Sequence, residues 1–282
     1  MHKSVFVLAL AACGSTHGGG PGDQGVDASG SSIVDAEPGD GGATDAAVDA
    51  PTPPAIQVLR GVDRASAFAL SEAKTLANSH GVQWTGVYIG GPCSAGSGWT
   101  KSVVSSLASN VGWVFMPIFV GQQTSSICGA DTLTAAQGTS DGEAAAAKMA
   151  SFGWDAHQNI PVCLDLEAGS YGANPSGSLA YAKAWRDAVR SAGYLAYLYS
   201  NPTAINALYD GNVKFDGAWP ASWFYTNFAS VSPSDLDQLG TRYTNENRAW
   251  QYAGSFAVSG AGDVDGDSSD LLLAPAPGGT NL

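Results

Sequence analysis

The residues best suited to chemistry are Asp165 and Glu167, which are separated by one leucine and directly follow the apolar segment PVCL. Side chains at positions i and i+2 of a β-strand lie on one face, so both carboxyl groups are expected to lie together. Two carboxylates held this close repel each other, which raises one pKa and prepares a general acid. Hydrolysis of a glycosidic bond needs such an acid beside a second carboxylate. The alternative is a strand that runs into an acidic, solvated loop or a cation site.

Two other aspartates have a similar position next to apolar segments. Asp63 ends the segment 56–62, and Asp270 opens the apolar sequence DLLLA. We expect both at the same site, although Asp63 could instead cap the following helix. The run DVDGDSSD at 263–270 has the first spacings of a calcium loop, but its twelfth position is Ala274 instead of a glutamate. We therefore expect no calcium there.

Aromatic and amide side chains near the ends of the apolar segments are candidates for binding a sugar, whose C–H faces stack on aromatic rings. Core packing is the alternative for each aromatic residue. The candidate substrate-binding residues are Tyr88, Gln122, Tyr199, Trp223, Gln251 and Tyr252.

Several other functional classes are not expected. The chain has 12 Lys and Arg against 25 Asp and Glu, a net charge of −13, which argues against binding to nucleic acid. The four histidines are scattered without metal-ligand spacing, so we expect no metal. The sequence has no G-x-S-x-G elbow, no P-loop and no strand–GxGxxG–helix unit, and we expect no cofactor.

The N-terminal part of the chain differs from the rest. Residues 1–12 have the charged start and apolar run of a signal peptide, and LAAC at 10–13 resembles the lipobox of bacterial lipoproteins, in which Cys13 would be lipidated. An ordinary signal with an incidental cysteine is the alternative. Residues 13–54 are rich in Gly, Pro and Asp and lack Phe, Trp and Tyr, so we expect a disordered linker. Membrane attachment would then be by the lipid anchor only.

The remaining residues, 55–282, alternate between apolar segments of strand length and helical segments. Strands are expected at 56–62, 85–91, 114–121, 161–167, 194–200, 217–224, 249–253 and 270–273, with helices at 65–79, 100–111, 141–153, 177–192 and 203–209. Eight such strands in this length predict a single α/β domain, a (β/α)₈ TIM-type barrel that is irregular in its last units. A doubly wound open sheet is the alternative. In a barrel the site lies at the C-terminal ends of the strands, where the candidate residues fall.

Three cysteines lie within this domain. Cys93 and Cys128 follow the second and third predicted strands, whose ends are neighbours in a barrel, so we expect a disulfide between them in an exported protein. Cys163 lies inside a predicted strand and is expected to be a buried thiol.

The order of short motifs resembles a known family. GVD at 61–63, GVYIGG at 86–91, PVCLDLE at 161–167, AWQYAG at 249–254 and SDLLLA at 269–274 follow in turn. This order is similar to the glycoside-hydrolase-like domain family of exported bacterial proteins of unknown function, which in turn resembles the Chalaropsis-type lysozymes. The resemblance implies a (β/α)₈ or related barrel, with Glu167 as general acid and Asp165 as its stabilising partner. It also implies that Asp63, Asp270 and the W-Q-Y segment at 250–252 belong to the active site.

Two functions from different classes remain open at this point. The first is a glycoside hydrolase of the cell envelope that cleaves the glycan strands of peptidoglycan. The second is a non-catalytic barrel that binds glycan at the envelope. Either reading predicts an exported, lipid-anchored monomer whose partner is a polysaccharide.

Overall fold

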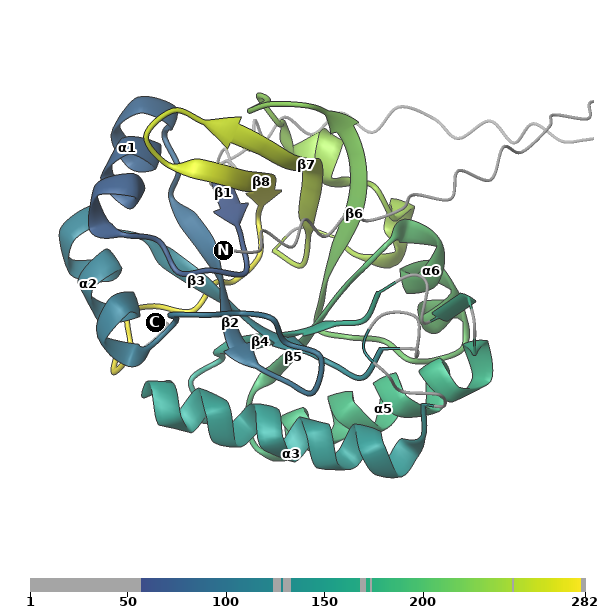
Figure 1. Cartoon of the computed structure of the whole chain (residues 1–282). Helices are drawn as coiled ribbons and strands as arrows, with labels where there is room; N and C mark the ends of the chain where they lie inside the picture. Colours follow the sequence, from purple (N-terminus) through teal and green to yellow (C-terminus); the bar gives the residue numbers. More distant parts are fainter. Residues whose placement is uncertain are drawn as a thin grey trace, which may run out of the picture. The chain divides into compact units, whose positions relative to one another are not determined.

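The structure is a computed structural model and describes residues 57–123, 128, 133–167, 171–172, 174–244 and 246–279. The predicted signal peptide, Cys13 and the predicted linker lie outside the described residues. From β1 to β8 the strands close into a barrel in chain order, which confirms the TIM-like barrel predicted from the sequence (Figure 1).

The strands pair with their neighbours in the chain. Strands β1 to β7 run parallel, whereas β8 lies between β7 and β1 and is antiparallel to both. The strands are β1 (Leu59–Asp63), β2 (Trp84–Gly90), β3 (Val114–Val120), β4 (Pro161–Asp165), β5 (Leu195–Ser200), β6 (Gly217–Tyr225), β7 (Ala249–Val258) and β8 (Gly262–Ser269).

Helices follow the first five strands, and all of these helices except the first begin at a side-chain cap. The Thr100 side chain accepts a hydrogen bond from the Val103 backbone N–H at the start of α2, and Thr134 caps α3 in the same way. The Thr134 cap explains why α3 begins six residues before the predicted position 141. The helices are α1 (Leu70–His80), α2 (Lys101–Val111), α3 (Ala135–Phe152), α5 (Pro175–Ser191) and α6 (Pro202–Asp210).

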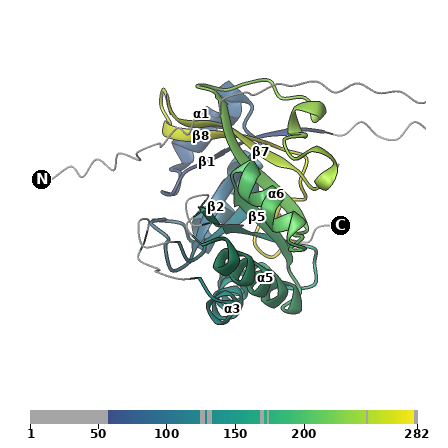
Figure 2. The same ribbon diagram turned by 90° about the vertical axis from the view of Figure 1, so that its right-hand side faces the viewer.

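Helices α3 and α5 pack side by side against the barrel (Figure 2). Glycine at position 138 permits this close approach, because a Cβ atom there would lie 2.3 Å from the Tyr181 carbonyl oxygen. None of the helices in the described ranges is long and apolar enough to cross a lipid bilayer.

The last units of the barrel depart from the strand–helix alternation, as predicted. Two short 3₁₀ helices, Pro233–Leu236 and Gly240–Arg242, lie between β6 and β7, and β7 turns directly into β8 as a hairpin. In Figure 1 the helices surround the other strands, and this hairpin forms the upper side of the barrel.

The prediction of an eighth strand at 270–273 is wrong. The eighth strand is β8, which consists of most of the aspartate-rich run that looked like a loop. Positive φ angles at Gly260 (80°) and Gly262 (79°) make the tight turn that brings this run back along β7. Leu271 and Leu273 after the strand are buried in the barrel interior, which explains their apolar character.

The core has two layers, one inside the barrel and one between the strands and the helices. Trp84 and Trp219 fill the interior, with ring centroids 5.4 Å apart and an edge-to-face arrangement. Above this packed interior, polar side chains project from the C-terminal ends of the parallel strands. The fold therefore leaves one end of the barrel for a site and uses aromatic packing below it.

Candidate active site

Asp63 is the last residue of β1, and its carboxylate is 1% exposed at the C-terminal end of the barrel. One of its oxygens accepts a hydrogen bond from the Tyr88 hydroxyl at 2.8 Å, and the other accepts one from the Gln251 amide nitrogen at 3.0 Å. Burial raises the pKa of Asp63, and these hydrogen bonds oppose the rise. The structure thus places Asp63, Tyr88 and Gln251 in one network.

Asp165 ends β4, and Glu167 follows it after one buried leucine. Gln123 fixes the backbone here: its amide nitrogen donates to the Asp165 carbonyl at 2.9 Å, and its amide oxygen accepts from the Glu167 N–H at 2.9 Å. Gln123 is fully buried. This residue was missed in the sequence, where its neighbour Gln122 was favoured, and only the pairing of two loops reveals its role.

The Asp165 and Glu167 carboxyl groups both have raised pKa values. For Asp165 the rise is large and comes first from burial, then from the charges of Glu167 and Asp63. For Glu167 burial is again the main cause, followed by the charge of Asp63. No described group donates a hydrogen bond to the Asp165 Oδ1 atom, although this atom is buried. The site therefore retains protons at a pH where ordinary carboxyl groups have lost them.

Strand β8 contributes two carboxyl groups that the sequence analysis did not select, Asp265 and Asp267. Asp265 pairs with Asp63 in the ladder between β8 and β1, and Asp267 lies one step deeper opposite Gly61. Burial, followed by the charges of Asp63 and Glu167, raises the pKa of Asp265 to about 8. The i, i+2 spacing of these two residues is the same signal as the D-x-E pair, and it could have identified them had the run been assigned to a strand.

Gln251 on β7 connects the carboxylates with the aromatic residues of the site. Its amide oxygen accepts hydrogen bonds from the Tyr199 hydroxyl at 2.9 Å and from the Trp223 indole N–H at 2.8 Å. Trp223 is 46% exposed at the end of β6. Burial raises the pKa of Tyr199, and the charges of Glu167, Asp165, Asp63 and Asp265 raise it further. This agrees with the placement of all four carboxyl groups at the C-terminal end of the parallel strands, which we call the mouth of the barrel.

Space at this mouth depends on Gly86 in β2. A Cβ atom at position 86 would lie 2.8 Å from the Asp63 Cβ and 2.7 Å from the Ile118 Cδ1. A cleft of about 440 Å³ opens beside Asp63 and Asp265 and is lined mainly by small polar residues, among them Ser66, Ser97 and Ser255. The cleft and the carboxylates belong to the same end of the barrel.

The expectation that Asp270 lines this mouth is wrong. Because β8 is antiparallel, its beginning lies at the mouth and its end lies at the opposite end of the barrel, where Ser269 pairs with Leu59 at the start of β1. Asp270 there forms a buried ion pair with Arg248, with 2.5 Å between Oδ2 and Nη2. Its role in the structure is to pair a buried guanidinium group.

Gln122 and Tyr252 are also placed apart from the carboxylates. The Gln122 backbone N–H donates to the Tyr181 hydroxyl at 2.9 Å, and its side chain is hydrogen-bonded to Asp141 beside helices α3 and α5. Tyr252 is fully buried and packs against Trp250, with 5.8 Å between the ring centroids. Successive residues of a strand face opposite sides, so Gln251 points to the site and Tyr252 to the outer core.

Cys93 and Cys128 form a disulfide with their Cα atoms 5.5 Å apart. The Cys93 sulfur also accepts the Gln123 N–H at 3.2 Å, so this cross-link lies next to the glutamine that holds the D-x-E backbone. Cys163 is a free, buried thiol. Among the described residues, no group of three or more His, Cys, Asp or Glu side chains is arranged to hold a metal ion.

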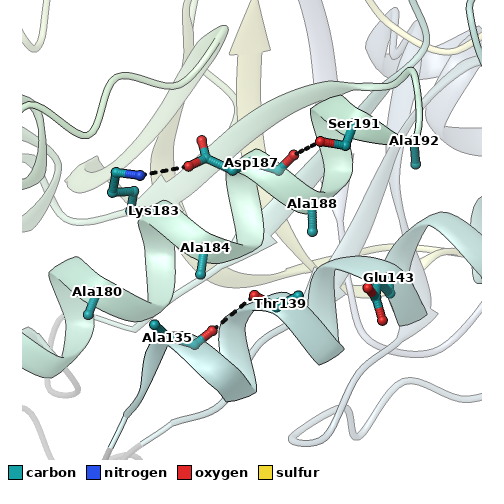
Figure 3. Close-up of a pocket in the computed structure, with 10 residues that line it drawn as sticks. All are labelled: Ala135, Thr139, Glu143, Ala180, Lys183, Ala184, Asp187, Ala188, Ser191 and Ala192. Carbon is teal, nitrogen blue, oxygen red and sulfur yellow. Dashed lines mark hydrogen bonds and ion pairs between the residues drawn. The ribbon is translucent and has the colours of Figure 1, made fainter.

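A larger groove, of about 740 Å³, lies between α3 and α5 on the outside of the barrel (Figure 3). Its polar side chains mostly bond within their own helix: Lys183 pairs with Asp187 at 2.8 Å, and Thr139 donates to the Ala135 carbonyl at 3.2 Å. The rest of its lining is largely alanine. We therefore place the candidate site at the barrel mouth, where buried carboxylates converge, and not in the larger groove.

Comparison with solved structures supports the fold. An uncharacterized B. stearothermophilus protein aligns with a TM-score of 0.53 and 16% identity over 74% of this chain and 94% of that protein. The autolysin LytC from Streptococcus pneumoniae aligns with a TM-score of 0.50 and 16% identity over 75% of this chain and 46% of LytC. The Tat-secreted protein Rv2525c from Mycobacterium tuberculosis aligns with a TM-score of 0.50 and 14% identity over 79% of this chain and all of that one (100%). These identities show a shared barrel and leave the activity open.

Sequence comparison gives a more specific result. No curated protein matches the chain. A family profile, that of the Rv2525c-like, glycoside hydrolase-like domain, matches residues 74–270. This range contains β2 to β8 and with them every carboxylate of the mouth except Asp63. The chain therefore belongs to the Rv2525c-like glycoside hydrolase-like domain family.

Proposed function

We propose that the barrel is a glycoside hydrolase of the cell envelope that cleaves the glycan strands of peptidoglycan. The observation that carries this proposal is the group of buried carboxylates at the C-terminal end of the barrel strands, with raised pKa values at Asp165 and Glu167. The family supports a hydrolase-like role, and LytC, a barrel of similar fold, is an autolysin.

Glu167 serves as the general acid in this proposal. Burial, followed by like charges, raises the pKa of both members of the D-x-E pair, so the pair retains a proton at a pH where ordinary carboxyl groups have lost theirs. Glu167 is the more exposed of the two and delivers this proton to the glycosidic oxygen as the bond from that oxygen to the anomeric carbon breaks. Water then adds to the anomeric carbon and returns a proton to the pair.

Asp165 stabilises the positive charge that develops on the sugar. Its carboxyl group is buried, and one oxygen receives no hydrogen bond from a described group, so its charge is little offset when the pair ionises. In a sugar with an N-acetyl group, the acetamido oxygen can attack the anomeric carbon, and Asp165 would steady the resulting oxazolinium. Two further carboxyl groups line the mouth, those of Asp63 and Asp265. Asp63 is held in place by hydrogen bonds from Tyr88 and Gln251.

The exposed Trp223 favours a second function, binding of glycan without cleavage. Its ring is 46% exposed, and its N–H is anchored on Gln251 beside the carboxylates. A rigid aromatic ring beside hydrogen-bonding groups is a platform for a sugar, whether or not the bond is cleaved.

We also propose that the protein is exported as a monomer and anchored by a lipid at Cys13. Cys13→Ser should release it from the membrane fraction, and a variant that stays bound would refute the anchor.

The test of the proposed function compares the wild type with Glu167→Gln on purified peptidoglycan. The glutamine keeps the shape of the side chain but removes its proton, so the rate of release of reducing ends should fall by about 10² to 10⁴ while binding to the glycan is retained. Glu143→Gln is the matched control, because Glu143 is exposed on α3 in the outer groove. Binding without cleavage by both wild type and Glu167→Gln would refute the hydrolase and support the binding barrel. Absence of binding by the wild type would refute both functions.

A further inference from the structure

Asp267 is a buried carboxyl group for which the proposed reaction has no role. It lies on β8 and is 0% exposed, between Gly61 on β1 and Gln251 on β7. One of its oxygens, Oδ1, accepts a hydrogen bond from the Trp219 indole N–H at 3.1 Å. A carboxyl group at this depth is costly unless it is neutral or its charge is well compensated.

The carboxyl group of Asp63 is the second partner of the Asp267 carboxyl group. No described side chain or backbone group donates to the Asp267 Oδ2 atom. The side chains of Asp267 and Asp63 are hydrogen-bonded to each other. Two carboxyl groups can share a hydrogen bond only if one of them carries the proton.

The surroundings decide which of the two carries it. Asp63 already accepts the Tyr88 hydroxyl at 2.8 Å and the Gln251 amide at 3.0 Å, so two donors stabilise its negative charge. From the described N–H groups, Asp267 accepts only the neutral indole N–H of Trp219. The proton is therefore better placed on Asp267, and its hydroxyl donates to Asp63.

We propose that Asp267 is a positioning residue which, as a neutral carboxylic acid, donates a hydrogen bond to Asp63 and holds that residue as a carboxylate at the mouth. Its contribution to catalysis rests on the proposed function, whereas its protonation does not. Asp267 is too deeply buried to touch a substrate, so it would act only through Asp63.

The titratable groups around the pair agree with this placement. Burial raises the pKa of Asp267 well above its usual value, and the charges of Asp63 on β1 and Asp265 on β8 add to the rise. The charge of Asp267 also raises the pKa of Tyr252 on β7. Asp165 at the end of β4 and Glu167 just after it face Asp63 from across the mouth. Within the described part of the chain, no lysine or arginine is among the groups that shift the pKa of either Asp63 or Asp267.

The test replaces Asp267 by asparagine and by leucine in the full chain. Asparagine reproduces the neutral acid, because its oxygen can accept from Trp219 and its amide can donate to Asp63, whereas leucine removes both bonds. Asp263→Asn is the matched control, since Asp263 is exposed on the same strand. The first measurement is the number of protons released on unfolding at pH 6, from the pH dependence of urea unfolding.

A neutral Asp267 predicts that unfolding of the wild type releases about one proton more than unfolding of Asp267→Asn, because the acid ionises only when exposed. Asp263→Asn controls for the loss of a carboxyl group from the same strand. Equal release from the wild type and Asp267→Asn would show that Asp267 is already ionised in the folded state and would overturn the proposal. This result does not depend on any enzymatic activity.

The second measurement is cleavage of peptidoglycan, or its binding if the wild type does not cleave. We expect Asp267→Asn to stay within about threefold of the wild type, and Asp267→Leu to lose at least tenfold, similar to Asp63→Asn. Loss in Asp267→Asn as large as in Asp63→Asn would overturn the positioning role. If Asp267→Leu does not fold, the comparison of Asp267→Asn with Asp63→Asn decides alone.

Discussion

The ion pair between Arg248 and Asp270 lies at the end of the barrel opposite the mouth, and its removal should destabilise the protein without affecting the site. The two side chains are 6% and 1% exposed. Asp270 accepts the Arg248 backbone N–H at 3.0 Å through one oxygen, and the guanidinium Nε at 3.0 Å and Nη2 at 2.5 Å through the other. Asp270→Ala deletes the acceptor of all three bonds and leaves the guanidinium group buried.

The size of the effect follows from this burial. Removal of one partner from a buried ion pair typically lowers the free energy of unfolding by about 3–5 kcal/mol. Arg248 keeps its contact with Asp237, whose side chain is 53% exposed, so we expect the lower end of the range. In a domain of this size about 3 kcal/mol corresponds to a fall in Tm of roughly 6–12 °C.

The assay is urea unfolding of the full chain, followed by fluorescence of its tryptophans, with Asp263→Ala as the exposed control on β8. The double variant Arg248→Met/Asp270→Leu should recover most of the loss, because it removes the buried charge together with its partner. The reasoning is refuted if Asp270→Ala unfolds within about 1 kcal/mol of the wild type. If an Asp270 variant of normal stability lost glycan cleavage or binding, Asp270 would have a role in the functional site after all.

Two other predictions concern the mouth itself. Gly86→Ala brings a methyl group within 2.8 Å of the Asp63 Cβ, so it should lower the free energy of unfolding by about 1–3 kcal/mol and weaken glycan binding, and unchanged values in both assays would contradict the role of Gly86. Because the pKa of Asp265 is raised to about 8, the folded state holds a proton that the unfolded state loses near pH 4. Its stabilising contribution is complete below that pH and is lost as the pH rises to about 8. Asp265→Asn should therefore reduce the fall in the free energy of unfolding, measured by urea unfolding, between about pH 4 and about pH 8. An unchanged dependence of this free energy on pH would exclude the raised pKa of Asp265.

Much of the candidate site could be predicted because it depends on local spacing. Asp165 and Glu167 share a face through the two-residue period of a strand, and Asp63 ends an apolar strand that the sequence shows directly. Gln123 could not be selected in the same way. Two adjacent glutamines follow β3, and only the approach of the loop after β4 decides that Gln123 holds the D-x-E backbone while Gln122 contacts Asp141.

The sequence by itself determined the barrel class and the approximate positions of the first seven strands, because each apolar strand and each capped helix is encoded within a short segment. The tertiary structure alone decided the direction of the eighth strand. The hairpin at Gly260 and Gly262 reverses the chain, brings Asp265 and Asp267 to the mouth, and carries Asp270 to the opposite end. A run of aspartates has the same composition in a loop and in an antiparallel strand, and only pairing with β1 and β7 distinguishes them, because the partners lie far away in the sequence.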